Sequence, residues 1–234
     1  KIYWIFSEGG IEDDIYKMWY TGYNDSISTS PQAVWDVSTD YLFPETANVL
    51  TIHSSSSLDD TNTRILISGL DSNWNMLNES VTLNGTSNVT TSNSFLRVNQ
   101  MIVTRVGAGH LGNEGTITAR NNGNIYAQIN PQISKTQMAV YSVPAGYTLY
   151  ITQVTGLSGD AAGASKFMNF QCDIKNNVTG VNFILLRTTW QNIYQVQRVI
   201  PIAQTEKQDL KWQLYTGQGT YSGSIIVEGA LIKN

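Results

Sequence analysis

The sequence has few charged residues and a single cysteine, and both features exclude some classes of function. Only 14% of its 234 residues are charged, against about 25% in a typical domain. Cys172 is the only cysteine, so the chain holds no internal disulfide and no multi-cysteine metal site. The net charge is −4, and the 14 basic residues are scattered along the chain. A nucleic-acid partner is therefore not expected, because such binding needs Lys and Arg gathered on one face.

Long apolar runs are also missing. A membrane-spanning helix needs about 20 apolar residues, whereas runs such as VNFILL at 181–186 have the length of a strand. A chain of this length buries roughly 70% or more of its unfolded surface, so we expect it to fold without disulfides or a metal. Because the chain begins with Lys1 rather than Met, we expect that it is processed or forms part of a longer product.

One segment near the N-terminus has helical periodicity. In GGIEDDIYKMWY, Ile11, Ile15, Met18 and Trp19 fall on one helical face, and three acidic residues occupy the first turn, where the helix dipole favours them. The sequence therefore predicts that residues 1–30 form an N-terminal arm or short helix followed by a linker.

The rest of the chain reads as β-structure. Short alternating runs rich in Val, Ile, Thr, Tyr and Phe are separated by turn residues. The expected strands are 33–37, 48–52, 64–68, 79–83, 95–106, 115–119, 125–129, 138–143, 147–154, 167–174, 182–187, 194–202, 210–215 and 223–232. The predicted fold class is all-β, an antiparallel jelly-roll-like β-sandwich after the helix or arm. It spans residues 31–234 as one large sandwich or as two small ones divided near 130–137.

The stretch GLDSNWNMLNESVTLNG at 69–85 has the alternating oxygen ligands of a calcium loop. Asp71, Asn73 and Asn75 match its opening, but Met76 and Thr82 stand where an EF-hand requires Gly and Glu. Asx turns at Asp71 and Asn73, formed as the chain leaves a strand, are the favoured interpretation. No metal site is predicted.

Two further patterns point to catalysis only superficially. Gly107, Gly109 and Gly112 reproduce a dinucleotide fingerprint, but no helix follows to hold a pyrophosphate, so a loop between strands is favoured. His53 and His110 are the only histidines, and no nucleophile elbow accompanies them. We therefore expect no catalytic residues, no cofactor and no enzyme activity.

Two glycine turns should shape the sheets. Asn84–Gly85 is expected to close a hairpin between ESVTL and TSNVTT. In SVPAGYTLYI, Pro144 is expected to set the first corner of a turn, and Gly146 to take a positive φ in a hairpin.

Aromatic and apolar residues supply two hypotheses about partners. Six Trp and twelve Tyr among many amides could form a sugar-binding platform if their rings are bare. The N-terminal run Ile2, Tyr3, Trp4, Ile5 and Phe6 would aggregate unless it is covered. We therefore expect this run to be an interface with another subunit.

Several blocks between residues 33 and 155 resemble a known family. They are VWDVSTDYLFP, the GLD…W…NE.VTLNG block, the strand that contains Phe95, Arg97 and Val98, the G..GN.GTIT loop and the VPAG.T.YI hairpin. Together they resemble virion structural proteins of tailed bacteriophages. The resemblance implies a β-sandwich on the phage particle, without catalysis, and carries over no active-site residues.

The expected function is accordingly that of a non-enzymatic structural subunit of a phage virion. It would be a capsid-decoration or minor capsid protein, or a protein of the tail or fibre. Its expected partners are other virion proteins and copies of itself as a homo-oligomer. The alternative is a glycan-binding module for attachment to a host cell.

Overall fold

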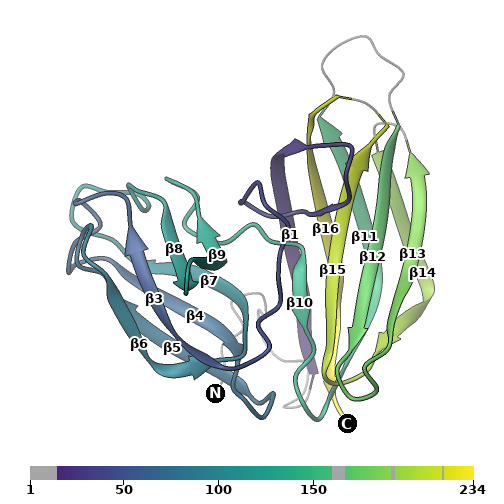
Figure 1. Cartoon of the computed structure of the whole chain (residues 1–234), viewed down its shortest axis with the longest axis horizontal. Coiled ribbons are helices and arrows are strands. Elements are labelled where there is room, and N and C mark those ends of the chain that lie inside the picture. Colours follow the sequence, from purple (N-terminus) through teal and green to yellow (C-terminus); the bar gives the residue numbers. More distant parts are fainter. Residues whose placement is uncertain (1–14, 160–166, 191–192, 218) are drawn as a thin grey trace. The chain divides into compact units, whose positions relative to one another are not determined.

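The computed structural model describes residues 15–159, 167–190, 193–217 and 219–234. It is all-β in these residues (Figure 1). The chain divides into two compact units, the first formed by residues 1–41 and 138–234 and the second by residues 42–137. The expected interface Ile2–Phe6 lies outside the described residues.

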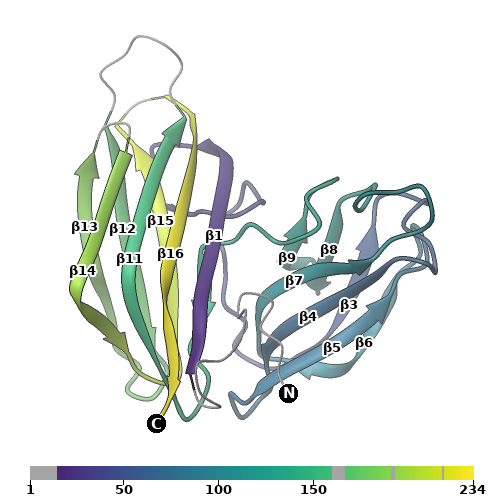
Figure 2. The ribbon, with the colours of Figure 1, turned by 180° about the vertical axis from the view of Figure 1, so that it is seen from behind.

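The first unit contains two antiparallel sheets. One sheet has the order β1-β16-β11-β14, and the other has the order β10-β15-β12-β13, with β2 also paired to β15 (Figures 1 and 2). The strands are β1 (Ile15–Ile27), β2 (Gln32–Ala33), β10 (Val140–Ser142), β11 (Tyr147–Gly159), β12 (Met168–Asn176), β13 (Asn182–Trp190), β14 (Ile193–Gln204), β15 (Gln208–Thr216) and β16 (Tyr221–Lys233).

These two sheets enclose one core. The indole Nε1 of Trp212 on β15 donates to the Tyr20 hydroxyl on β1 over 2.9 Å, which joins the two layers. The ring of Phe170 on β12 stacks on Trp212 at 5.2 Å between centroids. Leu149 and Ile151 on β11 are buried in the same core.

The second unit also has two sheets, ordered β6-β3-β8-β9 and β5-β4-β7. Its strands are β3 (Asn48–Ser54), β4 (Arg64–Leu70), β5 (Met76–Thr82), β6 (Val89–Phe95), β7 (Arg97–Arg105), β8 (Ile117–Asn121) and β9 (Asn124–Ile129). Buried aliphatic side chains such as Ile52, Ile67 and Ile117 fill its core, together with Phe95.

The predicted fold class is corrected by this arrangement. Four small antiparallel sheets of three to five strands replace the expected jelly-roll-like β-sandwich, and no helix occurs in the described residues. The chain passes between the units twice, after Tyr41 and after Gln137, so the second unit is inserted in the first. The first unit is therefore assembled from two separated pieces of sequence.

The predicted helix and linker were wrong where the structure describes them. Residues 15–27 form β1, which pairs along its length with β16. Met18, Tyr20 and Asn24 are buried at alternating positions along this segment, which is the pattern of a strand rather than of a helix. Gly22 lies on the same inward face. No side chain fits there, because a Cβ would stand 2.1 Å from the Val34 carbonyl oxygen.

Two turns lie at the predicted residues, but the expected hairpins do not form. Gly85 has φ 58°, yet β5 pairs with β4 and β6 pairs with β3. Gly146 has φ 75°, and the Tyr147 amide donates to the Pro144 carbonyl. Pro144 thus opens the turn instead of occupying its first corner. This turn connects β10 and β11, which belong to different sheets.

Candidate interaction surface

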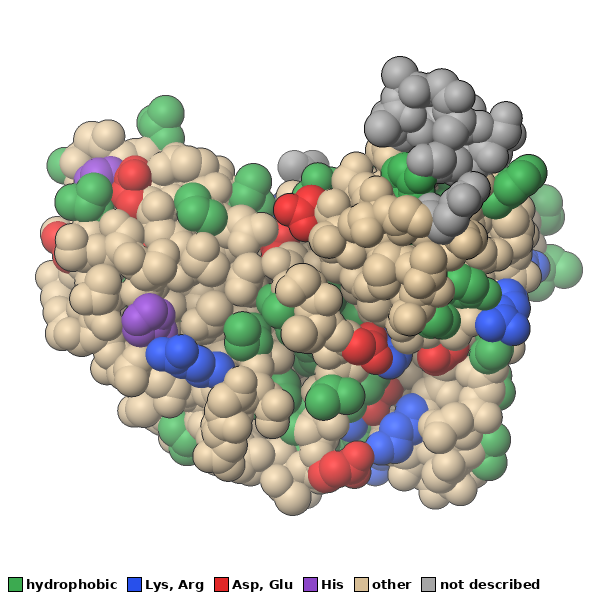
Figure 3. Space-filling view, turned by 45° about the horizontal axis from the view of Figure 1, so that its top comes forward, with side chains coloured by type: hydrophobic (Ala, Val, Ile, Leu, Met, Phe, Trp, Pro, Cys, Tyr) green, Lys and Arg blue, Asp and Glu red, His purple; other side chains and the backbone are tan. Residues whose placement is uncertain are grey.

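Strands β13 and β14 end their respective sheets on the same side of the first unit (Figures 1 and 2). Between Asn182 and Gln204 the only charged side chains are Arg187 and Arg198, and no acid is present. Hydrophobic and basic side chains mark the right-hand margin of the space-filling view, the side on which β13 and β14 lie (Figure 3). We call these two strands the β13–β14 edge.

A wide bulge interrupts β14. Gln197 pairs with Gln153 and Ile202 pairs with Ile151, so four residues of β14 face the single residue Thr152 of β11. The bulged segment is Arg198–Pro201. Its Val199 and Ile200 side chains are 101% and 82% exposed, which makes them an apolar protrusion from a sheet margin.

More apolar side chains are bare on and beside β13. Phe183 and Ile184 are exposed by 40% and 49%, and Val181 just before the strand is exposed by 55%. Single exposed apolar residues are ordinary, but a contiguous group marks an interaction site. Phe183 and Ile184 are adjacent on β13 and pair with Ile174 and Asp173 of β12, so their side chains leave on opposite faces of the strand.

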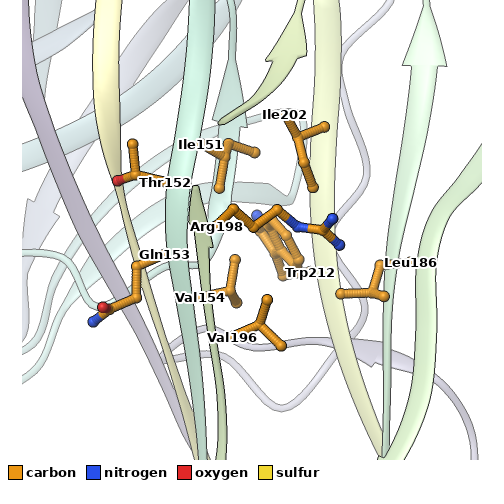
Figure 4. A pocket seen from close by; sticks show the side chains of 9 residues that line it. All are labelled: Ile151, Thr152, Gln153, Val154, Leu186, Val196, Arg198, Ile202 and Trp212. Carbon is orange, nitrogen blue, oxygen red and sulfur yellow. The ribbon is translucent and has the colours of Figure 1, made fainter. Parts of the chain in front are cut away.

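A small apolar cavity opens beneath the bulge, between the two sheets. Arg198 runs across it in front of Trp212, with Ile151 and Ile202 on one side and Val154 and Val196 on the other (Figure 4). Leu186 of β13 completes the apolar wall. The cavity measures about 10 Å³, which is room for roughly one water molecule. The aliphatic stem of Arg198 thus covers apolar surface, and its guanidinium extends toward the side of the cavity where Leu186 lies (Figure 4).

Both strands of the edge are shaped against simple strand addition. The β12–β13 register shifts between Cys172 and Asp173, which leaves Leu185 as an extra residue on β13. Pro201 offers no amide hydrogen, and the bulge turns β14 away from a regular ladder. Such devices suppress edge-to-edge pairing. A partner at this edge would therefore be held by side-chain packing.

A polar array covers the outer face of the β12–β15 pair. Gln171 donates to Asp173 at 2.9 Å and to Gln213 at 2.8 Å. Lys211 forms an ion pair of 2.7 Å with Asp40. Burial raises the pKa of Asp173 above its ordinary value, and the positive charge of Lys211 partly offsets that effect. The Gln171–Gln213 contact joins β12 to β15, and the Lys211–Asp40 pair ties β15 to the segment that follows β2.

Of the sixteen Trp and Tyr residues that the structure describes, seven lie in the core: Trp35, Trp190, Trp212, Tyr20, Tyr41, Tyr126 and Tyr141. Eight are half-buried, and Tyr23 on β1, which is 40% exposed, is the most exposed of the described rings. A glycan site needs at least two bare rings in a groove with amides beside them. In the described residues, one ring reaches this exposure, not two.

The stretch at 69–85 contains the turn that the Asx interpretation predicts. One carboxylate oxygen of Asp71 accepts from the amides of Asn73 and Asn75 at 2.8 and 2.9 Å, and the other accepts from the Asn75 side chain. Trp74 has φ 67°, and its ring lies 4.8 Å from the Arg97 guanidinium, which also lies over Phe43. The carboxylate oxygens of Asp71, which the sequence pattern offered as calcium ligands, thus stabilise the β4–β5 turn by hydrogen bonds.

The glycine pattern at 107–112 lies in the loop between β7 and β8, as expected. His110 contacts Glu114 at 2.8 Å, and Gln132 donates to the same carboxylate oxygen. These hydrogen bonds lower the pKa of Glu114. His53 lies within β3, where it pairs with Thr118. The structure therefore places both histidines in the second unit.

Asp59, in the serine-rich loop of the second unit, is fully buried. Its carboxylate accepts from the Ser54 hydroxyl at 2.5 Å and from the amides of Glu114 and Gly115 at 2.8 and 2.9 Å. These contacts fasten the loop before β4 to the loop before β8. In the part of the chain that the structure describes, no group of three His, Cys, Asp or Glu residues is arranged to hold a metal ion. No helix there is long and apolar enough to cross a membrane.

Sequence reasoning missed the β13–β14 edge. It identified YQVQRVIPI only as a strand, although Pro201 inside such a run signals an edge strand or a bulge. The spacing of hydrophobic residues could not show that Val199 and Ile200 leave the core. That information resides in the register of β14 against β11.

Comparisons with known proteins give little further guidance. No protein-family model and no curated protein matches the chain. Among solved structures, a chain of the infectious bursal disease virus Gt strain is similar at TM-score 0.19 and 10% identity, over 96% of this chain and 73% of that one. At this TM-score the similarity carries no argument.

Proposed function

We propose that this protein is a non-enzymatic structural subunit of a tailed-phage virion that acts through packing against neighbouring subunits. The position on the particle is that of a capsid-decoration, minor capsid, tail or fibre protein. The observation that carries the proposal is the β13–β14 edge, where Val199 and Ile200 project into solvent. Apolar surface of this kind is stabilised when a partner covers it.

The resemblance of residues 33–155 to phage virion proteins supplies the biological setting for that surface. The contacts of three aspartates support the same conclusion. Asp71 accepts from backbone amides of its own turn, and Asp59 accepts from the amides of Glu114 and Gly115 in another loop. Asp209 accepts from the Ser142 hydroxyl at 2.5 Å and from the side-chain amide of Asn177 at 2.8 Å. Their contacts hold turns and strands in place.

Immunogold electron microscopy of purified phage tests the proposal. Antibody raised against this chain should decorate intact particles at a repeating position, and the label should identify that position. Particles that carry no label and contain no copy of the chain by mass spectrometry would contradict the proposal.

Host attachment predicts a different outcome in a second assay. A glycan-binding module should bind host cells as a purified protein, and a Tyr23→Ala variant should lose that binding, because Tyr23 is the most exposed Trp or Tyr ring in the described residues. A packing subunit should bind cells no better than an unrelated protein. Saturable, Tyr23-dependent binding would favour attachment over packing.

A further inference from the structure

We infer that Asn122, at the tip of the β8–β9 hairpin, is a site of spontaneous modification at which the asparagine is converted to aspartate and isoaspartate. The chain contains two Asn–Gly dipeptides, Asn84–Gly85 and Asn122–Gly123. Asparagine is thermolabile, and a following glycine leaves the attacking backbone nitrogen unhindered because glycine has no Cβ. The two dipeptides have the same chemistry, but their surroundings differ. This inference is independent of the proposed function.

The reaction needs only the chain and water. The Gly123 backbone nitrogen gives up its proton and attacks the side-chain Cγ of Asn122, and the side-chain nitrogen leaves as ammonia. Water then opens the resulting cyclic imide. Opening at the side-chain carbonyl gives aspartate, and opening at the main-chain carbonyl gives isoaspartate. In sum, an amide and water are converted to a carboxylic acid and ammonia.

The turn at the hairpin tip leaves both reacting groups accessible. Asn121 pairs with Asn124 across it, and Asn122 and Gly123 have φ 48° and 83°, as in a type I′ turn. The hydrogen bond of such a turn joins its first and fourth residues, so it does not engage the Gly123 nitrogen. Asn122 and Gly123 are exposed, and no atom lies within 4 Å of the place that a Cβ of Gly123 would occupy.

The attacking nitrogen reaches the side chain only when the turn opens, and this tip is built to open easily. The β8–β9 register shifts between Ala119 and Arg120. Only the Arg120–Ile125 and Asn121–Asn124 pairs lie between that irregularity and the tip. Local opening of an exposed hairpin end requires little free energy compared with global unfolding. The folded protein therefore reaches the reactive conformation without losing its core.

The other dipeptide is held closed. Gly85 is buried, and its nitrogen donates to the Asp59 carbonyl at 2.8 Å. A Cβ on Gly85 would stand 3.2 Å from the Ser57 Cα, so the backbone of the serine-rich loop packs directly against it. Movement of this nitrogen toward the Asn84 side chain breaks the contact with Asp59, whose own side chain is fully buried. Asn84 should therefore be protected as long as the second unit is folded.

The adjacent Asn121 is also a poorer substrate. Its side-chain amide donates to the Val49 carbonyl at 3.0 Å, which restrains it against β3. The residue that follows it is Asn122 rather than glycine, and a Cβ there hinders the attacking nitrogen. The modification is thus assigned to a single one of the asparagines at this tip.

Conversion of Asn122 changes the hairpin in two ways. Either product adds one negative charge to the exposed tip. Isoaspartate also adds a carbon atom to the main chain, and a type I′ turn is defined by two central residues with positive φ. The isoaspartate form should therefore lose the Asn121–Asn124 pairing, while the aspartate form keeps it.

Incubation of the purified full chain in mildly alkaline buffer, followed by peptide mapping with mass spectrometry, tests the inference. The peptide with Asn122 should gain the mass difference between an amide NH₂ and a hydroxyl more than about tenfold faster than the peptide with Asn84, because only the tip opens locally. Enzymatic methylation of isoaspartate should label the same peptide. Conversion of Asn84 as fast as that of Asn122 would overturn the inference.

The same chain in concentrated urea is the control for structure. Both dipeptides should then react at similar rates, because the contact between Gly85 and Asp59 is gone. If Asn122 leads by the same ratio in urea, flanking sequence rather than the fold sets the difference, and the structural assignment is wrong.

Matched variants show the effect on charge. On isoelectric focusing, the Asn122→Gln variant should form far less of the acidic species that appears during incubation, because glutamine closes the larger ring slowly. The Asn84→Gln variant should acidify like the parent. Unchanged acidification of Asn122→Gln, with Tm equal to that of the parent, would also contradict the inference.

Discussion

The two units hold themselves together by different means. In the first, contacting rings run through the core in the order Tyr141, Tyr20, Trp212, Phe170 and Trp190. In the second, aliphatic side chains fill a smaller core, and buried polar groups fasten the loops at its margin. Much of the first unit's stability should therefore come from apolar area, while that of the second depends more on satisfied hydrogen bonds.

The largest expected effect is on the aromatic core of the first unit. Trp212→Ala removes the stack on Phe170 and leaves the Tyr20 hydroxyl without its indole donor. Replacement of a buried Trp costs about 3–5 kcal/mol of unfolding free energy. Urea unfolding followed by circular dichroism measures the loss. The control Tyr23→Ala removes a ring of the same unit that is 40% exposed and should cost less, about 1 kcal/mol. Equal losses in the two variants would show that the ring series is not the basis of stability.

The corresponding substitution in the second unit is Asp59→Asn. The amide keeps the shape of the side chain but presents an NH₂ group to backbone amides that already donate to the carboxylate. We expect a loss of about 2–3 kcal/mol, since hydrogen bonds to a charged group are broken in a buried site. Asp60→Asn is the control on the neighbouring, more exposed carboxylate, which accepts from Asn62. A loss no greater than in this control would refute the anchoring role of Asp59.

Backbone conformation alone should produce a smaller effect. Gly146 has φ 75°, and no atom lies within 4 Å of the place that a Cβ would occupy, so a side chain there meets strain but no clash. Gly146→Val should cost roughly 1 kcal/mol or more for that reason. Gly217 is equally open but does not have a φ in the left-handed region, so Gly217→Val should cost less. Equal stability of Gly146→Val and the parent would show that the positive φ is not required.

Most strands were predictable because their apolar residues alternate, whereas β1 was not. Its inward positions include Gly22 and Asn24, two residue types that in a sequence indicate a linker rather than a strand. Gly22 is required by the close approach of Val34, and the buried Asn24 side chain donates to the Val37 carbonyl at 3.4 Å. Both contacts depend on a chain segment that only the folded structure brings against β1.

The alternation of buried and exposed residues also fails to predict which side chains face the core where a bulge shifts the strand by one residue. In β11, Leu149 and Ile151 face the core, but the register shift at Thr152 turns Val154 inward in place of Gln153. The same displacement faces the β14 bulge that carries Val199 and Ile200. A local sequence pattern cannot show a bulge that is defined by pairing with two other strands. The candidate surface was therefore hidden from sequence analysis for the same reason as the phase change.

The smallest expected effects concern pH, and they should have opposite signs in the two units. Asp173 in the first unit has a pKa raised mainly by burial, so the folded state binds its proton more tightly than the unfolded state. Its contribution to stability is present at low pH and is lost as pH rises through the folded pKa. Glu114 in the second unit has a pKa lowered by the hydrogen bonds from His110 and Gln132. Its contribution is present above the unfolded pKa and is lost as pH falls through the folded one.

Neutral variants separate these two contributions. Asp173→Asn should raise Tm relative to the parent at about pH 7 more than at about pH 3, because it removes a carboxylate that is unfavourable when charged. Glu114→Gln should lower Tm more at neutral than at acid pH, because it removes a carboxylate whose charged form is favoured. Thermal unfolding of the three proteins at both pH values measures the difference. Two shifts of the same sign would mean that burial at Asp173 is outweighed by its attraction to Lys211, and the electrostatic contrast between the units would then be absent.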